Sequence, residues 1–168
     1  MNEEEIVDAL ESIRGRFYGK YRGTVTQVDA GTMRVKAKVP AVLGDTESGW
    51  ALPCVPYAGD AVGFAFLPEV GSACWFEFEE GRASFPIWAG GFWLSQQVPS
   101  DAAPAVKVIV TKQHKLLLDD DGDSISIQDS NGNSVTLASG GITLTRGSQT
   151  IQISDSEVNV NNGALEVV

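Results

Sequence analysis

The last third of the chain carries a repeat of short apolar pairs. Between residues 106 and 168, pairs of apolar residues two positions apart recur seven times, and the segments between them are rich in Gly, Asn, Asp and Ser. Residues two positions apart point to the same face of a β-strand. The repeat therefore predicts seven short strands joined by polar turns. The pairs are Leu116/Leu118, Ile125/Ile127, Val135/Leu137, Ile142/Leu144, Ile151/Ile153, Val158/Val160 and Leu165/Val167.

These strands need partners to build a core. Each buries only two side chains, so the units must stack on one another. No aromatic residue and no proline follows residue 104, which suits a narrow core of Val, Ile and Leu in which every backbone N–H is paired. Three copies wound about one axis provide such a core. We therefore expect an intertwined trimeric β-helix, or β-prism, whose trimer core is the seven pairs; a flat antiparallel meander or half of a β-sandwich is the alternative.

The residues before this repeat have a different composition. Every Phe, Trp and Tyr lies between Phe17 and Trp93. Five segments show strand-like alternation or β-rich composition, and five consecutive short strands favour a small barrel, most commonly an OB-fold. We expect the pairs Phe64/Phe66 and Phe76/Phe78 in its core. The expected strands are residues 18–28, 32–39, 61–66, 73–78 and 86–89.

The expected organisation is all-β with a short helix in front. Ile6, Leu10 and Ile13 recur at helical spacing, which predicts a helix over residues 1–15 that packs on its own domain or docks on a partner subunit. The OB-fold domain would follow at 16–97. Residues 98–105 are small, polar and Pro-bearing, as is typical of a linker. The β-helix would then occupy 106–168.

Charge argues against several partners. The chain has 12 Lys and Arg against 22 Asp and Glu, a net charge of −10, so its surface should repel nucleic acid and anionic lipid. The run Arg34, Lys36 and Lys38 is expected to be a solvated strand face. No segment has the length of a membrane span, and the N-terminus does not resemble a signal peptide; we expect synthesis in the cytoplasm. Cys54 and Cys74 are expected as buried apolar residues rather than a redox pair.

No catalytic constellation is present in the sequence. His114, the single histidine, has no sequence context that pairs it with a nucleophile. The acidic segment Asp119–Asp123 does not place its Gly and Glu as a calcium-binding EF-hand loop requires, so it is expected to be a solvated corner, with weak cation binding as a minority alternative. We therefore expect no enzyme activity, no cofactor and no metal site.

Several stretches together resemble one family. They are residues 23–36, 50–59, 67–71 followed by 75–78, and 114–122 followed by 125–127 and 132–137. In combination they are similar to the central spikes of contractile injection systems, namely phage baseplate assembly protein V and the VgrG-type spikes. The resemblance covers about residues 16–168. It implies an OB-fold domain followed by a trimeric β-helix spike.

The resemblance also implies partners and a mechanical role. A homotrimer would sit with its OB domains on a baseplate hub protein, carry a PAAR-repeat tip protein at its C-terminal end, and puncture the target envelope when a sheath contracts. It would be assembled into a phage-tail-like particle or injection apparatus and would touch the target membrane only on firing. The lysozyme-like insertion and fused hub domains of some relatives are missing, and one histidine cannot form the His-x-His iron site of some phage spikes.

Two other functions fit parts of the sequence. A monomeric OB-fold protein that binds nucleic acid or another ligand, with a β-rich acidic tail, is the main alternative. A left-handed β-helix transferase is disfavoured, because a hexapeptide period and a catalytic histidine context are missing.

Overall fold

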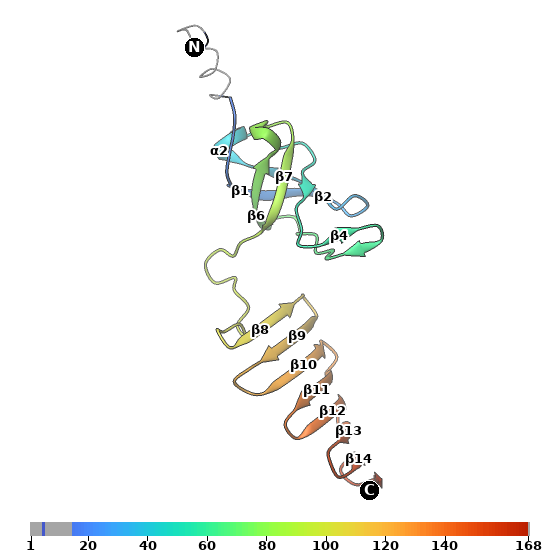
Figure 1. Ribbon diagram of the computed structural model, residues 1–168. Helices are drawn as coiled ribbons and strands as arrows, with labels where there is room; N and C mark the ends of the chain where they lie inside the picture. The colour runs from blue at the N-terminus through green and yellow to red at the C-terminus, as the bar shows by residue number, and fades with distance from the viewer. Residues whose placement is uncertain (1–4, 6–14, 168) are drawn as a thin grey trace. The chain divides into compact units, whose positions relative to one another are not determined.

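The computed structural model describes residue 5 and residues 15–167, excluding the side chains of residues 166 and 167. Its internal contacts divide the chain into two compact units, residues 1–96 (unit 1) and residues 97–168 (unit 2). Figure 1 shows both units as ribbons. The helix expected over residues 1–15 lies almost wholly outside the described residues.

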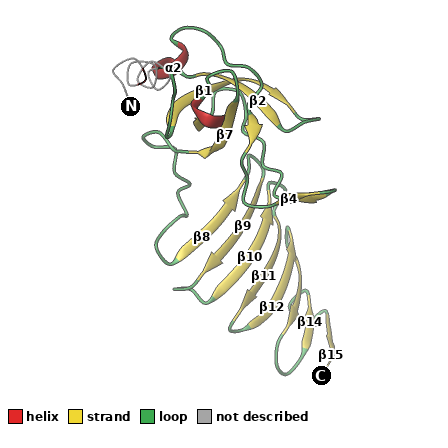
Figure 2. Ribbon diagram, turned by 45° about the horizontal axis from the view of Figure 1, so that its top comes forward, coloured by secondary structure: helices red, strands yellow, loops and turns green. Residues whose placement is uncertain are grey.

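Unit 1 is built on a curled five-stranded sheet (Figures 1 and 2). The strand order is β2-β1-β6-β7-β3, and only the β3–β7 pair is parallel. A backbone bridge joins the two ends of the sheet, with Ala51 N donating to Val35 O at 2.8 Å. This order and closure make the sheet OB-like. The elements are β1 (Tyr21–Asp29), β2 (Arg34–Lys38), α2 (Pro40–Leu43), β3 (Leu52–Pro53), β6 (Ala73–Phe78), η1 (Glu79–Gly81) and β7 (Pro86–Gly91).

The core of unit 1 follows from alternation along its strands. In β6 every second residue is buried, so Phe76 and Phe78 lie inside, as the sequence predicts. Trp88 of β7 is also buried, and its indole N–H donates to Met33 O at 3.1 Å, which satisfies its polar atom. The buried apolar residues are Val25, Val35, Ala37, Val39, Ala51, Cys74, Phe76, Phe78 and Trp88.

The strand expected over residues 61–66 is much shorter than expected and is not part of the main sheet. Strand β5 (Val62–Gly63) ends at Gly63, where a Cβ atom would lie 2.7 Å from the carbonyl oxygen of Tyr57. It pairs only with β4 (Ala58–Gly59), in a small ribbon separate from the main sheet. Phe64 and Phe66 are therefore 52% and 58% exposed rather than in the core. The fifth strand of the curled sheet is β3 instead.

The two cysteines differ in burial, so the expectation that both are buried holds for one of them only. Cys74 is buried as expected, and burial raises the pKa of its thiol. Cys54 is exposed, contrary to expectation, because it lies just beyond β3.

In the basic run on β2, Arg34 and Lys38 are exposed and Lys36 is half-buried, while Val35 and Ala37 between them are buried. The run is therefore a strand face turned away from the core.

Unit 2 is an eight-stranded antiparallel meander in which each strand pairs with the next (Figures 1 and 2). All seven predicted strands are present, and β8, which the repeat does not include, adds an edge strand before them. A single chain thus forms the meander that the sequence left open as an alternative to the prism. The strands are β8 (Val106–Val110), β9 (His114–Asp119), β10 (Ser124–Asp129), β11 (Asn133–Ala138), β12 (Gly141–Arg146), β13 (Gln149–Ile153), β14 (Val158–Val160) and β15 (Leu165–Val167).

The residues expected as a linker are partly folded onto unit 2. Ala103 forms a backbone bridge with Val106, the first residue of β8. The Lys115 ammonium lies 3.0 Å from a carboxylate oxygen of Asp101. These contacts attach part of residues 98–105 to the first strands of the meander.

Gly23 allows the close approach of β1 to the core. A Cβ atom there would lie 2.6 Å from the ring of Phe76, which is fully buried and has no room to move. We expect Gly23→Ala to lower the free energy of unfolding of unit 1 by about 1–3 kcal/mol through overpacking. Urea unfolding followed by tryptophan fluorescence measures this, because all four tryptophans lie in unit 1.

Gly49→Ala is the matched control. A Cβ atom at Gly49 would meet its nearest neighbour, Ser84 O, at 4.0 Å, which is ordinary contact. We expect this variant to unfold like the unmodified protein. Equal destabilisation by the two variants would contradict the role given to Gly23.

Candidate functional site

The register of unit 2 aligns the seven apolar pairs into two continuous columns on one face of the sheet. Every apolar residue of one pair lies directly opposite an apolar residue of the next. We call this surface the apolar face. Its first column is Leu116, Ile127, Val135, Leu144, Ile151, Val160 and Leu165, and its second is Leu118, Ile125, Leu137, Ile142, Ile153, Val158 and Val167.

The turns explain why unequal spacings still give straight columns. Antiparallel pairing fixes which residues face each other, so a longer or shorter turn changes the interval along the chain and leaves the alignment intact. Turn residues that favour left-handed backbone make these reversals possible: Gly132, Asn161 and Asn162 all have φ between 51° and 78°. The variable spacing in the sequence is therefore variation in the turns alone.

The apolar face is uncovered within one chain. Ile127 is 57% exposed and Leu165 is 60% exposed. All nine buried apolar side chains belong to unit 1. Among the described residues of unit 2, no apolar side chain is buried. Such an extended apolar surface marks an interaction site.

The opposite face of the sheet is polar along its centre. Ser126 lies opposite Thr136, and the same line continues through Thr143, Gln152 and Asn159 on the following strands. Because successive residues of a strand point to opposite faces, these side chains lie on the side away from the apolar columns. The meander thus has one face suited to water and one suited to a protein interior.

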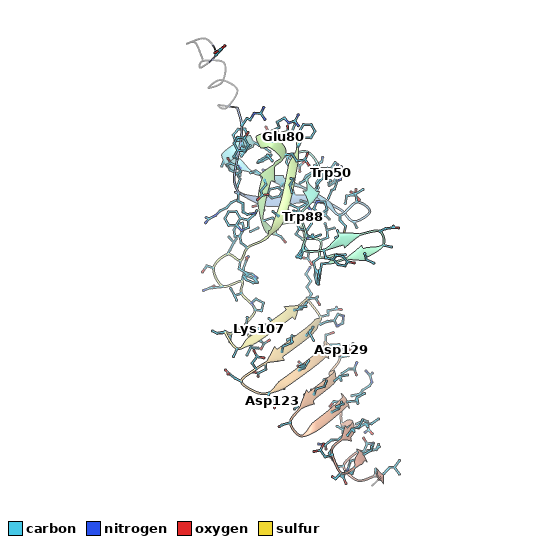
Figure 3. All side chains as sticks on the ribbon, in the orientation of Figure 1. Trp50, Glu80, Trp88, Lys107, Asp123 and Asp129 are labelled. Carbon is cyan, nitrogen blue, oxygen red and sulfur yellow. The ribbon has the colours of Figure 1, made fainter. Side chains whose placement is uncertain are left out.

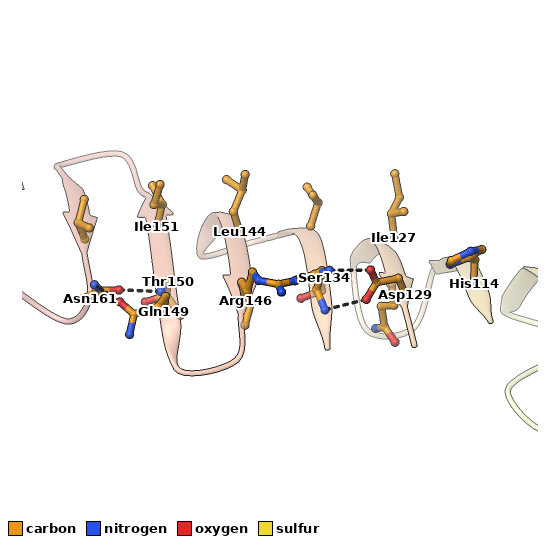
Figure 4. A pocket seen from close by; sticks show the side chains of 15 residues that line it. His114, Ile127, Asp129, Ser134, Leu144, Arg146, Gln149, Thr150, Ile151 and Asn161 are labelled. Atoms are coloured by element: carbon orange, nitrogen blue, oxygen red, sulfur yellow. Dashed lines mark hydrogen bonds between the residues drawn. The ribbon is translucent and has the colours of Figure 1, made fainter. Parts of the chain in front are cut away.

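A line of polar side chains borders one edge of the apolar face. We call it the polar margin; with the first apolar column it lines a groove of about 620 Å³. Figure 4 shows Ile127, Leu144 and Ile151 pointing to the same side of the sheet, with Asp129, Arg146 and Gln149 along the border. The polar margin consists of His114, Asp129, Asn133, Arg146, Gln149 and Asn161.

Hydrogen bonds connect neighbouring members of the polar margin. The Asp129 carboxylate accepts from Asn133 Nδ2 at 2.6 Å, and Arg146 Nη1 donates to Asn133 Oδ1 at 2.6 Å. Farther along, Asn161 Nδ2 donates to Gln149 Oε1. The margin therefore ties β10, β11 and β12 together at the edge of the groove.

Asp129 is held ionised by this arrangement. Its pKa is lowered from the usual 3.8 to about 2, first by the backbone N–H of Asn133 and then by the Asn133 side chain. The backbone N–H of Asn131 also donates, at 2.9 Å. A carboxylate that accepts several N–H bonds is stabilised in its charged form.

The other candidates from the sequence lie apart from any catalytic grouping. His114 is exposed at the start of β9 and faces Asp129 across the β9–β10 pair. The acidic corner Asp119–Asp123 forms the following turn, where Gly122 N donates to Asp119 Oδ1 at 2.8 Å. Within the described part of the chain, no three metal-binding side chains come together. No described helix has the length and apolarity that a membrane span requires.

Sequence reasoning missed the polar margin. Five of its members stand two residues from an apolar pair, as Asp129 does after Ile127 and Arg146 after Leu144. Extending the period of two by one step would have placed these five on the apolar face, whereas Asn161 lies in the turn after β14. Ile109 of β8, opposite Leu116 and 45% exposed, was missed for a different reason, because the period of two in β8 runs through Val106, Val108 and Val110, which alternate with Ile109.

Two protein-family models together match most of the chain. Residues 21–93 match the type VI secretion system/phage-baseplate injector OB domain. Residues 106–166 match the phage baseplate V C-terminal trimerisation domain. The first match covers the curled sheet of unit 1, and the second covers the meander of unit 2. A search of curated proteins finds no match.

The low pKa of Asp129 leads to a test by titration. Because the pKa is lower in the folded state, the ionised carboxylate stabilises the fold above the usual pKa of 3.8, and this contribution is lost as the pH falls through about 2. We expect the Asp129 carboxyl carbon to titrate by NMR with a midpoint near 2. Asn133→Ala, which removes the Nδ2 donor and keeps the backbone N–H, should raise that midpoint toward 3.8. An unchanged midpoint in the variant would contradict the proposed cause.

Proposed function

Given that the chain is a baseplate protein of the spike type, with an injector OB domain and a trimerisation domain, we propose that it is the homotrimeric central spike of a contractile injection machine. Three copies of unit 2 form a rigid needle, a β-prism whose interior is made of the three apolar faces. Three copies of unit 1 form a collar seated on a baseplate hub protein. When the sheath contracts, the needle is driven into the target envelope.

The uncovered apolar face is the observation that carries this proposal. Nine of its side chains are between 39% and 60% exposed in one chain, so covering them stabilises the assembly by about 1 kcal/mol each, or on the order of 10 kcal/mol per chain. That gain is comparable to the whole stability of an ordinary domain. The trimerisation-domain match supports three as the number of copies. In such a prism the polar face lies outside, in contact with water.

A prism of this kind suits mechanical work. The two columns at the centre of each interior face are aliphatic, and within each chain the strands are held by ladders of backbone hydrogen bonds that must break for the needle to fail. The proposed role is mechanical, and no catalysis is assigned to the chain. The outer edge of β15, which pairs only with β14 among the described strands, is the proposed seat of a PAAR-repeat tip protein.

A pair of adjacent substitutions tests the assembly. Ile151 lies on the apolar face and Gln152 on the polar face of the same strand. We expect Ile151→Asp to abolish the trimer, because three carboxylates would be buried without partners in the interior. Gln152→Asp should leave it intact, because the new charge faces water.

Light scattering on size-exclusion fractions measures the outcome. The unmodified protein and Gln152→Asp should each give three times 17.9 kDa, and Ile151→Asp should not. An Ile151→Asp variant that remains a trimer would show that this face is not the interior.

Extensive packing between the three apolar faces also predicts resistance to detergent. Because the apolar columns of the three chains must separate together, we expect unboiled samples to migrate as a trimer on SDS gels and boiled samples as a monomer. Migration as a monomer without heating would contradict so extensive an interior.

A further inference from the structure

The ribbon that leaves the barrel of unit 1 carries an exposed apolar surface that the spike role does not use. We call residues 57–66 the aromatic hairpin. The rings of Phe64 and Phe66 stack with their centroids 6.3 Å apart. Its large apolar side chains Tyr57, Val62, Phe64 and Phe66 are between 52% and 58% exposed.

Few backbone hydrogen bonds stabilise the aromatic hairpin. Its two strands share only the pairs Ala58–Gly63 and Gly59–Val62, followed by one more backbone bond from Phe64 N to Tyr57 O at 2.9 Å. An isolated two-stranded ribbon is marginally stable in water, and clustered exposed aromatic rings mark a contact surface. The hairpin therefore needs a surface to pack against.

Unit 1 also has a concave site beside its main sheet, near Trp50 (Figure 3), in which apolar and polar side chains mix. This site, which we call the barrel groove, has a volume of about 390 Å³. The side chains of Trp50, Leu52 and Phe85 in it are 38%, 40% and 46% exposed. The barrel groove is lined by Arg34, Trp50, Leu52, Glu79, Ser84, Phe85 and Pro86.

The aromatic hairpin and the barrel groove carry opposite charges. Asp60 stands at the tip of the aromatic hairpin, between β4 and β5, and has no ion-pair or hydrogen-bond partner among the described residues. Arg34 lines the barrel groove, and the ammonium group of Lys36 lies 5.0 Å from the ring centroid of Trp50. Glu79 is the single carboxylate in the groove lining. Asp60 thus supplies a charge opposite to that of Arg34 in the groove lining, whereas Lys36 beside Trp50 is already paired with Glu47 at 3.5 Å.

Three-fold symmetry requires this kind of pair. Around a three-fold axis each chain contacts its neighbours through two different surfaces, so a convex patch must meet a concave one. We propose that, in the trimer, the aromatic hairpin of each protomer occupies the barrel groove of a neighbouring protomer. The occupant of the groove is therefore a second copy of this chain. This inference rests on the trimer of the proposed function and adds a contact that closes the collar.

The chain connection favours a neighbouring copy over a separate protein. Residues 92–105 join β7 to β8 and reach at most about 50 Å when fully extended. Once three copies of unit 2 have assembled, the three copies of unit 1 stay within reach of one another at an effective concentration of roughly millimolar. Even a modest apolar contact is then formed in every trimer.

Disulfide trapping tests the contact in the full chain. In a Cys54→Ser background, Phe66→Cys places a thiol on the hairpin and Leu52→Cys places one in the groove, while Cys74 remains buried. After oxidation we expect a covalent trimer on boiled, non-reducing SDS gels, because three cross-links close the ring. The control combines Phe66→Cys with Arg22→Cys and should give monomer. Arg22 lies over the ring of Trp75, outside the groove lining.

Charge reversal is a second, independent measurement. Asp60→Arg should lower the midpoint of the thermal transition of unit 1 by a few degrees, because it places a third cation at the groove. Adding Arg34→Asp should restore the midpoint, since the pair is then reversed. Failure of the second substitution to restore it would overturn the contact between Asp60 and Arg34.

The outcomes separate this inference from the proposed function. A trimer by light scattering that gives covalent trimer on the gel supports both. A trimer that gives only monomer after oxidation overturns the hairpin contact, leaves the spike in place and frees the hairpin for a separate partner such as the hub. A monomer by light scattering for the unmodified protein overturns the proposed function and the inference together.

Discussion

The antiparallel register of unit 2 is the constraint on which the rest of the molecule depends. Because each apolar pair lies opposite the next, the chain forms a sheet with one apolar face and no layer of its own to cover that face. Water is a poor solvent for such a surface. The proposed trimer and its needle follow from the need to bury it.

The two units build cores from different residues. Unit 1 surrounds Phe76 and Trp88 with small residues such as Gly23 and Ala37, and closes a curled sheet within one chain. Unit 2 has only aliphatic pairs, which fill a narrow space but not the interior of an independent domain. In the proposed trimer, the composition change near residue 100 is a change from a core made within one chain to a core shared between chains.

Local periodicity explains how much could be predicted from the sequence. The period of two gave the strands and the apolar face of unit 2, because the spacing within each pair is strict even though the turns vary. Strand β3 was missed because only Leu52 and Pro53 form it, and Phe64 was misplaced because the strand ends at Gly63. The polar margin around Asp129 depends on hydrogen bonds between strands, which one strand's pattern does not contain. The number of chains is likewise a property of the assembly and not of any local pattern.

The central claim is that the apolar face of unit 2 is covered by two other copies of the chain. Sedimentation velocity of the unmodified protein over a wide dilution series tests it most directly. We expect one species of three times 17.9 kDa down to the lowest concentration measured. A folded, β-rich species of 17.9 kDa at any concentration in that series would contradict it.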